Sequence, residues 1–251
     1  MTAPALEPVP HELLDPVSQF PRRLQRFRRD GRPLPADLLY GRLIATAVQH
    51  VLGGGPAPEA SVRSADGTSA PLPLDRWLGP VDEADRAVLE LADSPVLDLG
   101  CGPGRHLAAL REAGKPGLGV DLSPVAVWVA RGRGAQAVPG DIFTAVPDAG
   151  SWATALLLDG NVGIGGAPAV LLRRTRQLLA QDGSALVELD PPGEPTYRTR
   201  VRLEAPGVVS EWFAWARVGV DGIGPPAAAA GLRVGETLSA GGRWFARLHV
   251  R

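Results

Sequence analysis

The 251-residue sequence predicts an α/β fold in which helices cover both faces of a mostly parallel β-sheet. Two observations predict it. From residue 75 onward, short apolar runs typical of buried strands alternate with amphipathic runs at helical spacing. One apolar run, 95–99, leads directly into a glycine-rich loop and then a helix, the local pattern of a ligand-binding turn in parallel sheets. The length suits one such domain with an appendage.

The first segment, 1–74, is predicted to be an N-terminal helical appendage or lid with a flexible linker. Its arginine-rich stretch 22–32 is typical of a solvated basic helix or tail, with a polyanion-binding arm as the alternative. Apolar residues recur at helical spacing over 36–52, and three glycines end that helix. Residues 53–74 are rich in Gly, Pro, Ser and Ala, which predicts the linker.

Residues 75–251 carry the alternating pattern. Helices are expected at 81–92, 105–113, 124–132 and 167–180, and strands at 95–99, 117–121, 135–139, 154–158, 184–189, 232–238 and 243–250. A stretch at about 197–218, divided by a Pro-Gly pair, interrupts the alternation. We expect it to be a hairpin-like insertion, with a helix over 211–217 as the alternative.

Charge and cysteine usage restrict the partners. With 26 Lys and Arg against 27 Asp and Glu, the chain gives no reason to expect nucleic acid or an anionic membrane. The single cysteine, Cys101, excludes an internal disulfide, and without a zinc-spaced Cys/His cluster no metal is expected. The start lacks a secretory signal, and no apolar stretch approaches the ~20 residues that span a bilayer. We expect a cytoplasmic protein with a small-molecule partner, and leave a homodimer open.

The glycine-rich loop carries the strongest functional signal. A strand ending in Asp98 runs into Gly100, Gly102 and Gly104, and a helix follows. Glycine permits a tight turn and lets a ligand approach the backbone, while the helix start offers free N–H groups. An adenosine-bearing ligand is therefore expected here.

Two features count against a dinucleotide. Arg105 occupies the position where the dinucleotide fingerprint requires its third glycine. Asp98, directly before the loop, would repel a pyrophosphate but favours a cationic group such as an α-ammonium, reached directly or through water. S-adenosylmethionine has an ammonium and a sulfonium and no phosphate.

Two further aspartates end successive predicted strands. Asp121 lies where a carboxylate usually accepts hydrogen bonds from ribose hydroxyls. Asp141 follows the next strand, so its carboxylate is placed for the adenine amine while Ile142 packs on the ring. A loop carboxylate or helix cap is the alternative for each one alone.

The segments Val96 to Gly104, Gly119 to Ser123 and Gly140 to Ile142 resemble the first, ribose and adenine motifs of the class I S-adenosylmethionine-dependent methyltransferases, of a kind similar to actinobacterial small-molecule enzymes. The resemblance, over roughly 77–251, implies a Rossmann-like seven-stranded sheet of order 3-2-1-4-5-7-6 with the last strand antiparallel, and S-adenosylmethionine as cofactor. The residues it places at the cofactor are Asp98, Gly100, Cys101, Gly102, Gly104, Asp121, Leu122, Asp141, Ile142 and Asp159.

Candidates on the methyl-accepting side are weaker. Asp159 and Asn161 follow the fourth strand, where this family places groups facing the methyl, although a tight turn with a cap explains them equally well. His106 could reach the site or be a first-turn packing contact. Trp212, Phe213 and Trp215 could line an apolar acceptor pocket, with core packing as the alternative. Further candidates are Tyr40 as part of a lid, His11 and His50 as bases brought in by the appendage, and His249, read as structural.

The predicted function is methyl transfer to an O, N or C atom of a small metabolite, in natural-product biosynthesis. Two alternatives stay open: a protein that binds S-adenosylmethionine without catalysis, and a nicotinamide oxidoreductase, which Asp98 and Arg105 disfavour. An Asp-Pro-Pro run at Asp190 is similar to an amino-group methyltransferase signature, but it follows the fifth strand instead of the fourth and lacks the aromatic residue.

Overall fold

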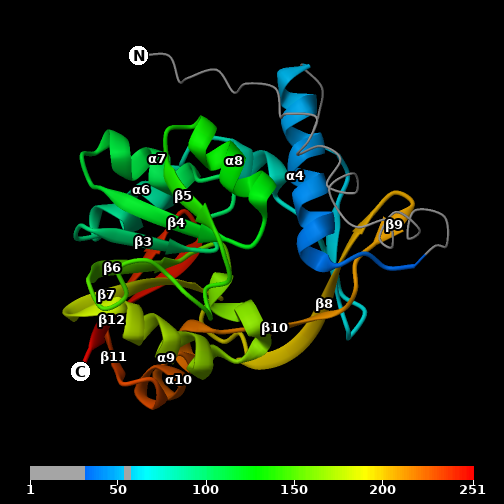
Figure 1. The fold of residues 1–251 in the computed structure, drawn as a ribbon. Helices are drawn as coiled ribbons and strands as arrows, with labels where there is room; N and C mark the ends of the chain where they lie inside the picture. Colours follow the sequence, from blue (N-terminus) through cyan, green and yellow to red (C-terminus); the bar gives the residue numbers. More distant parts are fainter. Residues whose placement is uncertain (1–31, 54–57) are drawn as a thin grey trace.

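The computed structural model describes residues 32–53 and 58–251. Figure 1 shows a central sheet with helices above and below it, and a second, smaller sheet beside the long helix α4. The candidate His11 and the arginines from Arg22 to Arg29 lie outside the described residues.

The central sheet has seven strands in the order β11-β12-β7-β6-β3-β4-β5. Neighbours from β7 to β5 are parallel, while the last strand, β12, is antiparallel to both β7 and β11. The predicted fold class and the order 3-2-1-4-5-7-6 are therefore confirmed. The strands are β3 (Val96–Leu99), β4 (Gly117–Asp121), β5 (Gln136–Pro139), β6 (Trp152–Leu157), β7 (Leu179–Leu189), β11 (Leu232–Ala240) and β12 (Arg243–Val250).

Helices bury one apolar stripe each against this sheet. On one face, α9 and α10 pack through Leu171, Leu172 and Ala227; on the other, α6 and α7 pack through Val88 and Leu110. Burial of these stripes on both faces explains why the parallel strands are nearly all apolar. The helices are α6 (Glu83–Glu90), α7 (Arg105–Glu112), α8 (Pro124–Gly132), α9 (Pro168–Leu178) and α10 (Gly224–Ala229), with short 3-10 helices η2 (Asn161–Gly166) and η3 (Val220–Gly222).

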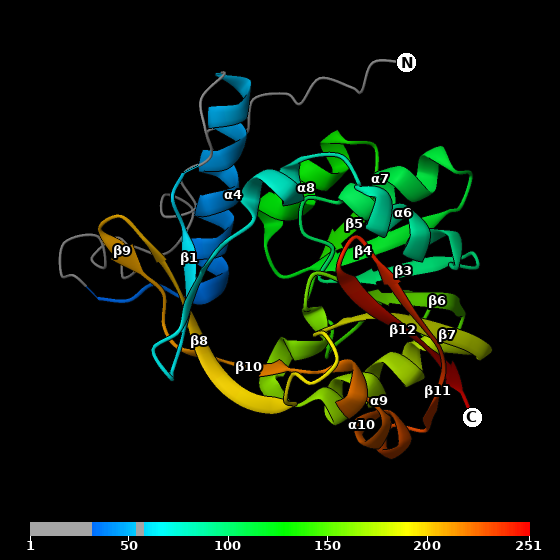
Figure 2. The same ribbon diagram turned by 180° about the vertical axis from the view of Figure 1, so that it is seen from behind.

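The second sheet joins segments that are far apart in the sequence. Its order is β10-β8-β1-β2, all antiparallel, and β9 also pairs with β8. Figure 2 shows β1 running beside β8. The strands are β1 (Ser61–Ser64), β2 (Ser69–Pro71), β8 (Tyr197–Ala205), β9 (Val208–Val209) and β10 (Phe213–Arg217). Antiparallel strands thus occupy the region where the hairpin-like insertion was predicted, and 213–217 is strand instead of helix.

The prediction of a linker over 53–74 is wrong for 61–71, because those residues form β1 and β2. The short, polar β1 pairs in register with β8, and the Arg63 guanidinium bonds to Glu204, 141 residues further along. Such a strand is stabilised by a partner that no local pattern reveals. The division of the chain near residue 74 stays a prediction.

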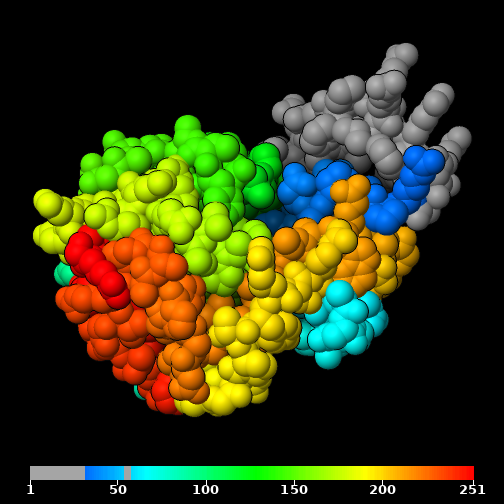
Figure 3. Space-filling view, turned by 90° about the horizontal axis from the view of Figure 1, so that it is seen from below, coloured from blue at the N-terminus to red at the C-terminus, as the bar shows by residue number. Residues whose placement is uncertain are grey.

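Helix α4 (Ala36–Leu52), which has the predicted bounds, is packed on the domain. Its buried face, including Leu39 and Ile44, contacts Val125 and Val129 of α8 and Leu203 of β8. The short helix α5 (Leu74–Leu78) joins the same cluster. Figure 3 shows α4 (blue), the 61–71 region (cyan) and β8–β10 (yellow to orange) gathered at one end of the molecule.

Within 32–53 and 58–251, no helix is both long and apolar enough to cross a membrane.

Candidate functional site

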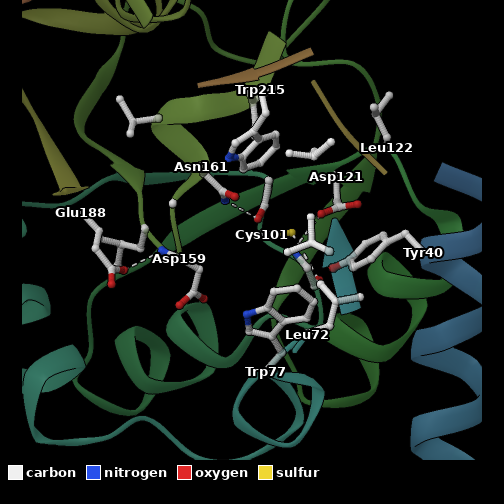
Figure 4. A pocket seen from close by; sticks show the side chains of 18 of the residues that line it. Tyr40, Leu72, Trp77, Cys101, Asp121, Leu122, Asp159, Asn161, Glu188 and Trp215 are labelled. Atoms are coloured by element: carbon white, nitrogen blue, oxygen red, sulfur yellow. Dashed lines mark hydrogen bonds between the residues drawn. The ribbon is translucent and has the colours of Figure 1, made fainter. Parts of the chain in front are cut away.

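A cavity of about 860 Å³ lies at the carboxyl ends of the central strands, beneath α4, α5 and the second sheet. The loops after β3, β4, β5, β6 and β7 all contribute to its walls. Figure 4 shows Tyr40, Cys101, Asp121, Asp159 and Asn161 around it. In open parallel sheets this edge is where ligands bind. The volume is at the upper end of the usual range for ligand sites, so it suits a cofactor together with a small second ligand.

The glycine loop opens onto the cavity at its first two glycines. Gly100 and Gly102 have φ of 77° and 52°, conformations that favour glycine. A Cβ on Gly100 would lie 2.8 Å from the Asn161 amide nitrogen, and one on Gly102 would lie 3.0 Å from the Tyr40 hydroxyl. Gly104 serves packing instead, since its Cβ would lie 2.6 Å from the Cβ of Ala130 in α8.

Asp121 ends β4 beside this loop. Its two carboxylate oxygens accept hydrogen bonds from the backbone N–H groups of Gly102 and Ser123, both at 2.8 Å. Burial raises the pKa of Asp121 to about 6, against the effect of these two bonds. The neighbouring Leu122 is 58% exposed at the cavity rim. Asp121 therefore ties the loop to β4 and still faces the cavity.

Asp141 and Ile142, after β5, also line the cavity. The Asp141 carboxylate accepts a hydrogen bond of 2.9 Å from the backbone N–H of Phe143, which fixes the turn. Ile142 is buried, and Phe143 beside it is exposed. This corner thus combines a carboxylate with apolar surface.

Asp98 is buried behind the loop and is not among the residues lining the cavity. Its Oδ2 has no hydrogen-bond partner within the described residues and lies 3.8 Å from Nδ1 of His106. The other ring nitrogen of His106 lies 3.4 Å from Asp85. Burial alone would lower the pKa of His106, but the two carboxylates outweigh it and raise the pKa to about 9. His106 is therefore a buried cation near neutral pH.

Asp159, two residues after the end of β6, belongs to a network of ion pairs and hydrogen bonds. Its carboxylate accepts hydrogen bonds of 2.9 and 3.0 Å from Arg105 and lies 3.2 Å from Arg76. Its backbone N–H donates to Glu188 at 2.7 Å, and Glu188 is bonded in turn to Arg243.

Asp85 anchors the other end of that network. It is fully buried and bonds to Arg105, His106 and Arg243. Burial would raise its pKa, but these three partners hold it well below the usual range. Sequence reasoning missed Arg76, Glu188 and Arg243, because pairs between α5, β7 and β12 leave no local pattern.

Asn161 clamps the glycine loop to the start of η2. Its side-chain amide donates to the carbonyl oxygens of Leu99 and Gly100, at 3.0 and 2.9 Å. All three side chains predicted for catalysis, Asp159, Asn161 and His106, line the cavity. Each already interacts with groups of the protein, so none is a free base.

The aromatic candidates separate into two groups. Tyr40, Phe213 and Trp215 line the cavity, whereas Trp212 does not and instead stacks under the Arg202 guanidinium at 4.9 Å.

His50 and His249 are also away from the cavity lining, and His249 pairs with Glu236. Asp190 lines the cavity in an ion pair with Arg217.

A family model and several solved structures of methyltransferases are similar to this chain. Residues 96–183 match the family model of a methyltransferase domain. A search of curated protein sequences found no match.

Among solved structures, one similar protein is an S-adenosylmethionine-dependent methyltransferase from Bacteroides fragilis, crystallised in complex with S-adenosylhomocysteine. It is 24% identical, with a TM-score of 0.70 over 87% of this chain and 98% of that one. The CcbJ methyltransferase from Streptomyces caelestis is 17% identical, with a TM-score of 0.52 over 69% and 91%. DesVI from Streptomyces venezuelae is 21% identical, with a TM-score of 0.50 over 66% and 90%. This chain thus has the class I methyltransferase fold, with a methyltransferase domain matched over residues 96–183.

Proposed function

We propose that this chain is an enzyme that transfers the methyl group of S-adenosylmethionine to an O, N or C atom of a small molecule. The observation that carries the proposal is a cavity whose lining combines the glycine loop, Asp121 and Asp141 with apolar side chains from the second sheet. The part lined by the second sheet offers room for an acceptor beside the cofactor.

The residues present fit S-adenosylmethionine. Gly100 and Gly102 line the cavity with positive φ, so a side chain at either position would be strained and would crowd the loop that we assign to the cofactor. We assign Asp121 to the ribose hydroxyls, Asp141 to the adenine amine, and the apolar Leu122 and Ile142 to the two faces of the ring.

The amino-acid end of the cofactor carries an ammonium and a carboxylate. Arg76 lines the cavity; its Nη2 lies 3.2 Å from Asp159 but makes no hydrogen bond within the described part of the chain, and we assign its guanidinium to the carboxylate. The Gly100 to Gly102 backbone, including Cys101, lies at this end, and Asp98 supports it from behind as a negative charge towards the ammonium.

When bound, the cofactor supplies a methyl group activated by its sulfonium. The chain's own contribution is positioning: Asn161 fixes the loop, Arg105 holds Asp159, and the second sheet lines the cavity on the acceptor side. Because the charged groups near the methyl side are paired, we propose that the rate comes from orientation more than from a strong general base.

A role in natural-product biosynthesis and a cytoplasmic location belong to the same proposal, and they rest on the sequence. The experiment is to incubate the chain with methyl-labelled S-adenosylmethionine and a metabolite extract from a producing strain. We expect label in a small-molecule fraction together with S-adenosylhomocysteine. Binding of the cofactor without any label transfer would reject the enzyme and favour the binding protein.

A further inference from the structure

The chamber next to the cofactor loops has apolar walls contributed by the second sheet. Val201 on β8 and Phe213 and Trp215 on β10 contribute to it, and Leu72, Trp77 and Ile164 line it as well. Figure 4 shows the indoles of Trp215 and Trp77 on opposite sides of Asn161 and Cys101 in that view. The chamber therefore offers flat aromatic surface close to the residues that precede η2.

Trp215 is held in place by packing against two elements. Its ring meets Phe213 edge to face, with centroids 6.1 Å apart and planes at 87°. On its other side a Cβ at Gly163 of η2 would lie 2.6 Å from the indole nitrogen, so glycine there admits the indole. Because η2 begins at Asn161, this packing fixes the ring beside the methyl-accepting side of the cavity.

The charged side chains around this chamber are already neutralised by one another. Glu188 accepts hydrogen bonds of 2.8 and 2.6 Å from Arg243, and Asp190 accepts one of 2.9 Å from Arg217. Asp37 lines the cavity as well and is exposed to water in the first turn of α4. A phosphate or carboxylate entering the chamber would lose hydration and find its cations already paired, and an ammonium would find only the water-exposed Asp37 among the described lining residues on this side.

We propose that the methyl acceptor is an uncharged molecule with a flat, aromatic body that lies against Trp215. This inference rests on the proposed function and deepens it by naming the substrate class. An aromatic body buries a large apolar area against the walls, and the indole N–H of the cavity-lining Trp77 is a donor for a carbonyl or hydroxyl oxygen. Charged sugars and carboxylated molecules are excluded by the same walls.

The test compares one uncharged aromatic probe with two charged probes. With the full chain saturated by S-adenosylhomocysteine, binding of 2-naphthol, 3-hydroxy-2-naphthoate and glucosamine is measured by calorimetry. We expect 2-naphthol to bind about tenfold or more tightly than either charged probe, since burying an unpaired charge is unfavourable. Equal or tighter binding of a charged probe, or no binding of 2-naphthol, would overturn the proposal.

Two tryptophan variants test where 2-naphthol binds. Trp215→Ala should weaken 2-naphthol binding roughly tenfold, while Trp212→Ala, the matched control outside the cavity, should leave it unchanged. Both should bind S-adenosylhomocysteine within about twofold of the parent, which reports folding. An equal effect of the two variants would reject Trp215 as the contact. If Trp215→Ala does not fold, the ranking of the three probes by affinity on the unmodified chain still tests the proposal. Absence of S-adenosylhomocysteine binding would instead reject the proposed function.

Discussion

The two halves of the cavity are built by different means. The cofactor half comes from successive turns of the central sheet and is held by backbone hydrogen bonds and buried charges, such as Asp121 and Asp85. The acceptor half comes mainly from segments 61–77 and 197–217, which meet only in the folded chain, and its walls combine apolar side chains with paired charges such as Asp190 and Arg217. The first half therefore presents buried charge and backbone groups to a ligand, whereas the second is shaped by side-chain packing.

The largest effect is expected from removing the buried charge that organises the cofactor half. Asp85→Ala would leave Arg105, Arg243 and His106 without their shared carboxylate. We expect a loss of about 3–5 kcal/mol in the free energy of unfolding, measured by urea denaturation. Asp93→Ala, which removes a largely exposed partner of Arg247, should cost about 0–1 kcal/mol. Similar losses for the two variants would show that the network contributes no stability.

The protonation of His106 predicts how stability changes with pH. Because the folded-state pKa of about 9 lies above the ordinary 6.5, the imidazolium stabilises the fold fully below pH 6.5, and this contribution is lost as the pH rises through 9. Its size is on the order of 3 kcal/mol. Unfolding free energies measured from pH 6 to 9.5 should fall over this window in the parent and stay flatter in His106→Gln. Parallel curves would contradict the assignment.

Cofactor affinity should depend on Asp121 and not on the acceptor half. Asp121→Ala should weaken S-adenosylhomocysteine binding by about 1–3 kcal/mol, the value of hydrogen bonds to a charged group. Asp190→Ala, on the acceptor side, is the matched aspartate control and should leave the affinity unchanged. Calorimetry measures both, and a larger effect at Asp190 would reverse the assignment of the two halves.

A smaller effect follows from the raised pKa of Asp121. With a pKa of about 6 in the free protein, the carboxylate is ionised at pH 7.5 and becomes protonated below 6. A neutral acid accepts weaker hydrogen bonds, so S-adenosylhomocysteine affinity should be constant above pH 7 and fall by roughly 1 kcal/mol towards pH 5. Asp121→Asn should remove this dependence, and a pH profile unchanged by that substitution would show that another group titrates.

The same contrast explains how much the sequence could predict. The strands β3 and β4 and the helix α8 were found at nearly their observed bounds, because apolar periodicity, a glycine turn and the Ser-Pro helix start at Ser123 are local signals. The cofactor candidates follow from the same turns. Of these, Asp98 and Gly104 lie behind the cavity lining, a detail that depends on packing against His106 and α8.

The acceptor half was largely beyond prediction. The polar β1 becomes a strand only by pairing with β8, and the Arg63–Glu204 bond joins residues 141 apart. Trp212 and Trp215 look alike in the sequence, yet only Trp215 lines the cavity. Contacts of this kind depend on the tertiary fold, so a single sequence carries no pattern from which to read them.

The most direct test of the central claim is a calorimetric titration of the intact chain with S-adenosylhomocysteine and, separately, with NAD. The account predicts saturable one-to-one binding of S-adenosylhomocysteine, competed by S-adenosylmethionine, and no heat from NAD. Binding of NAD in place of S-adenosylhomocysteine would contradict it.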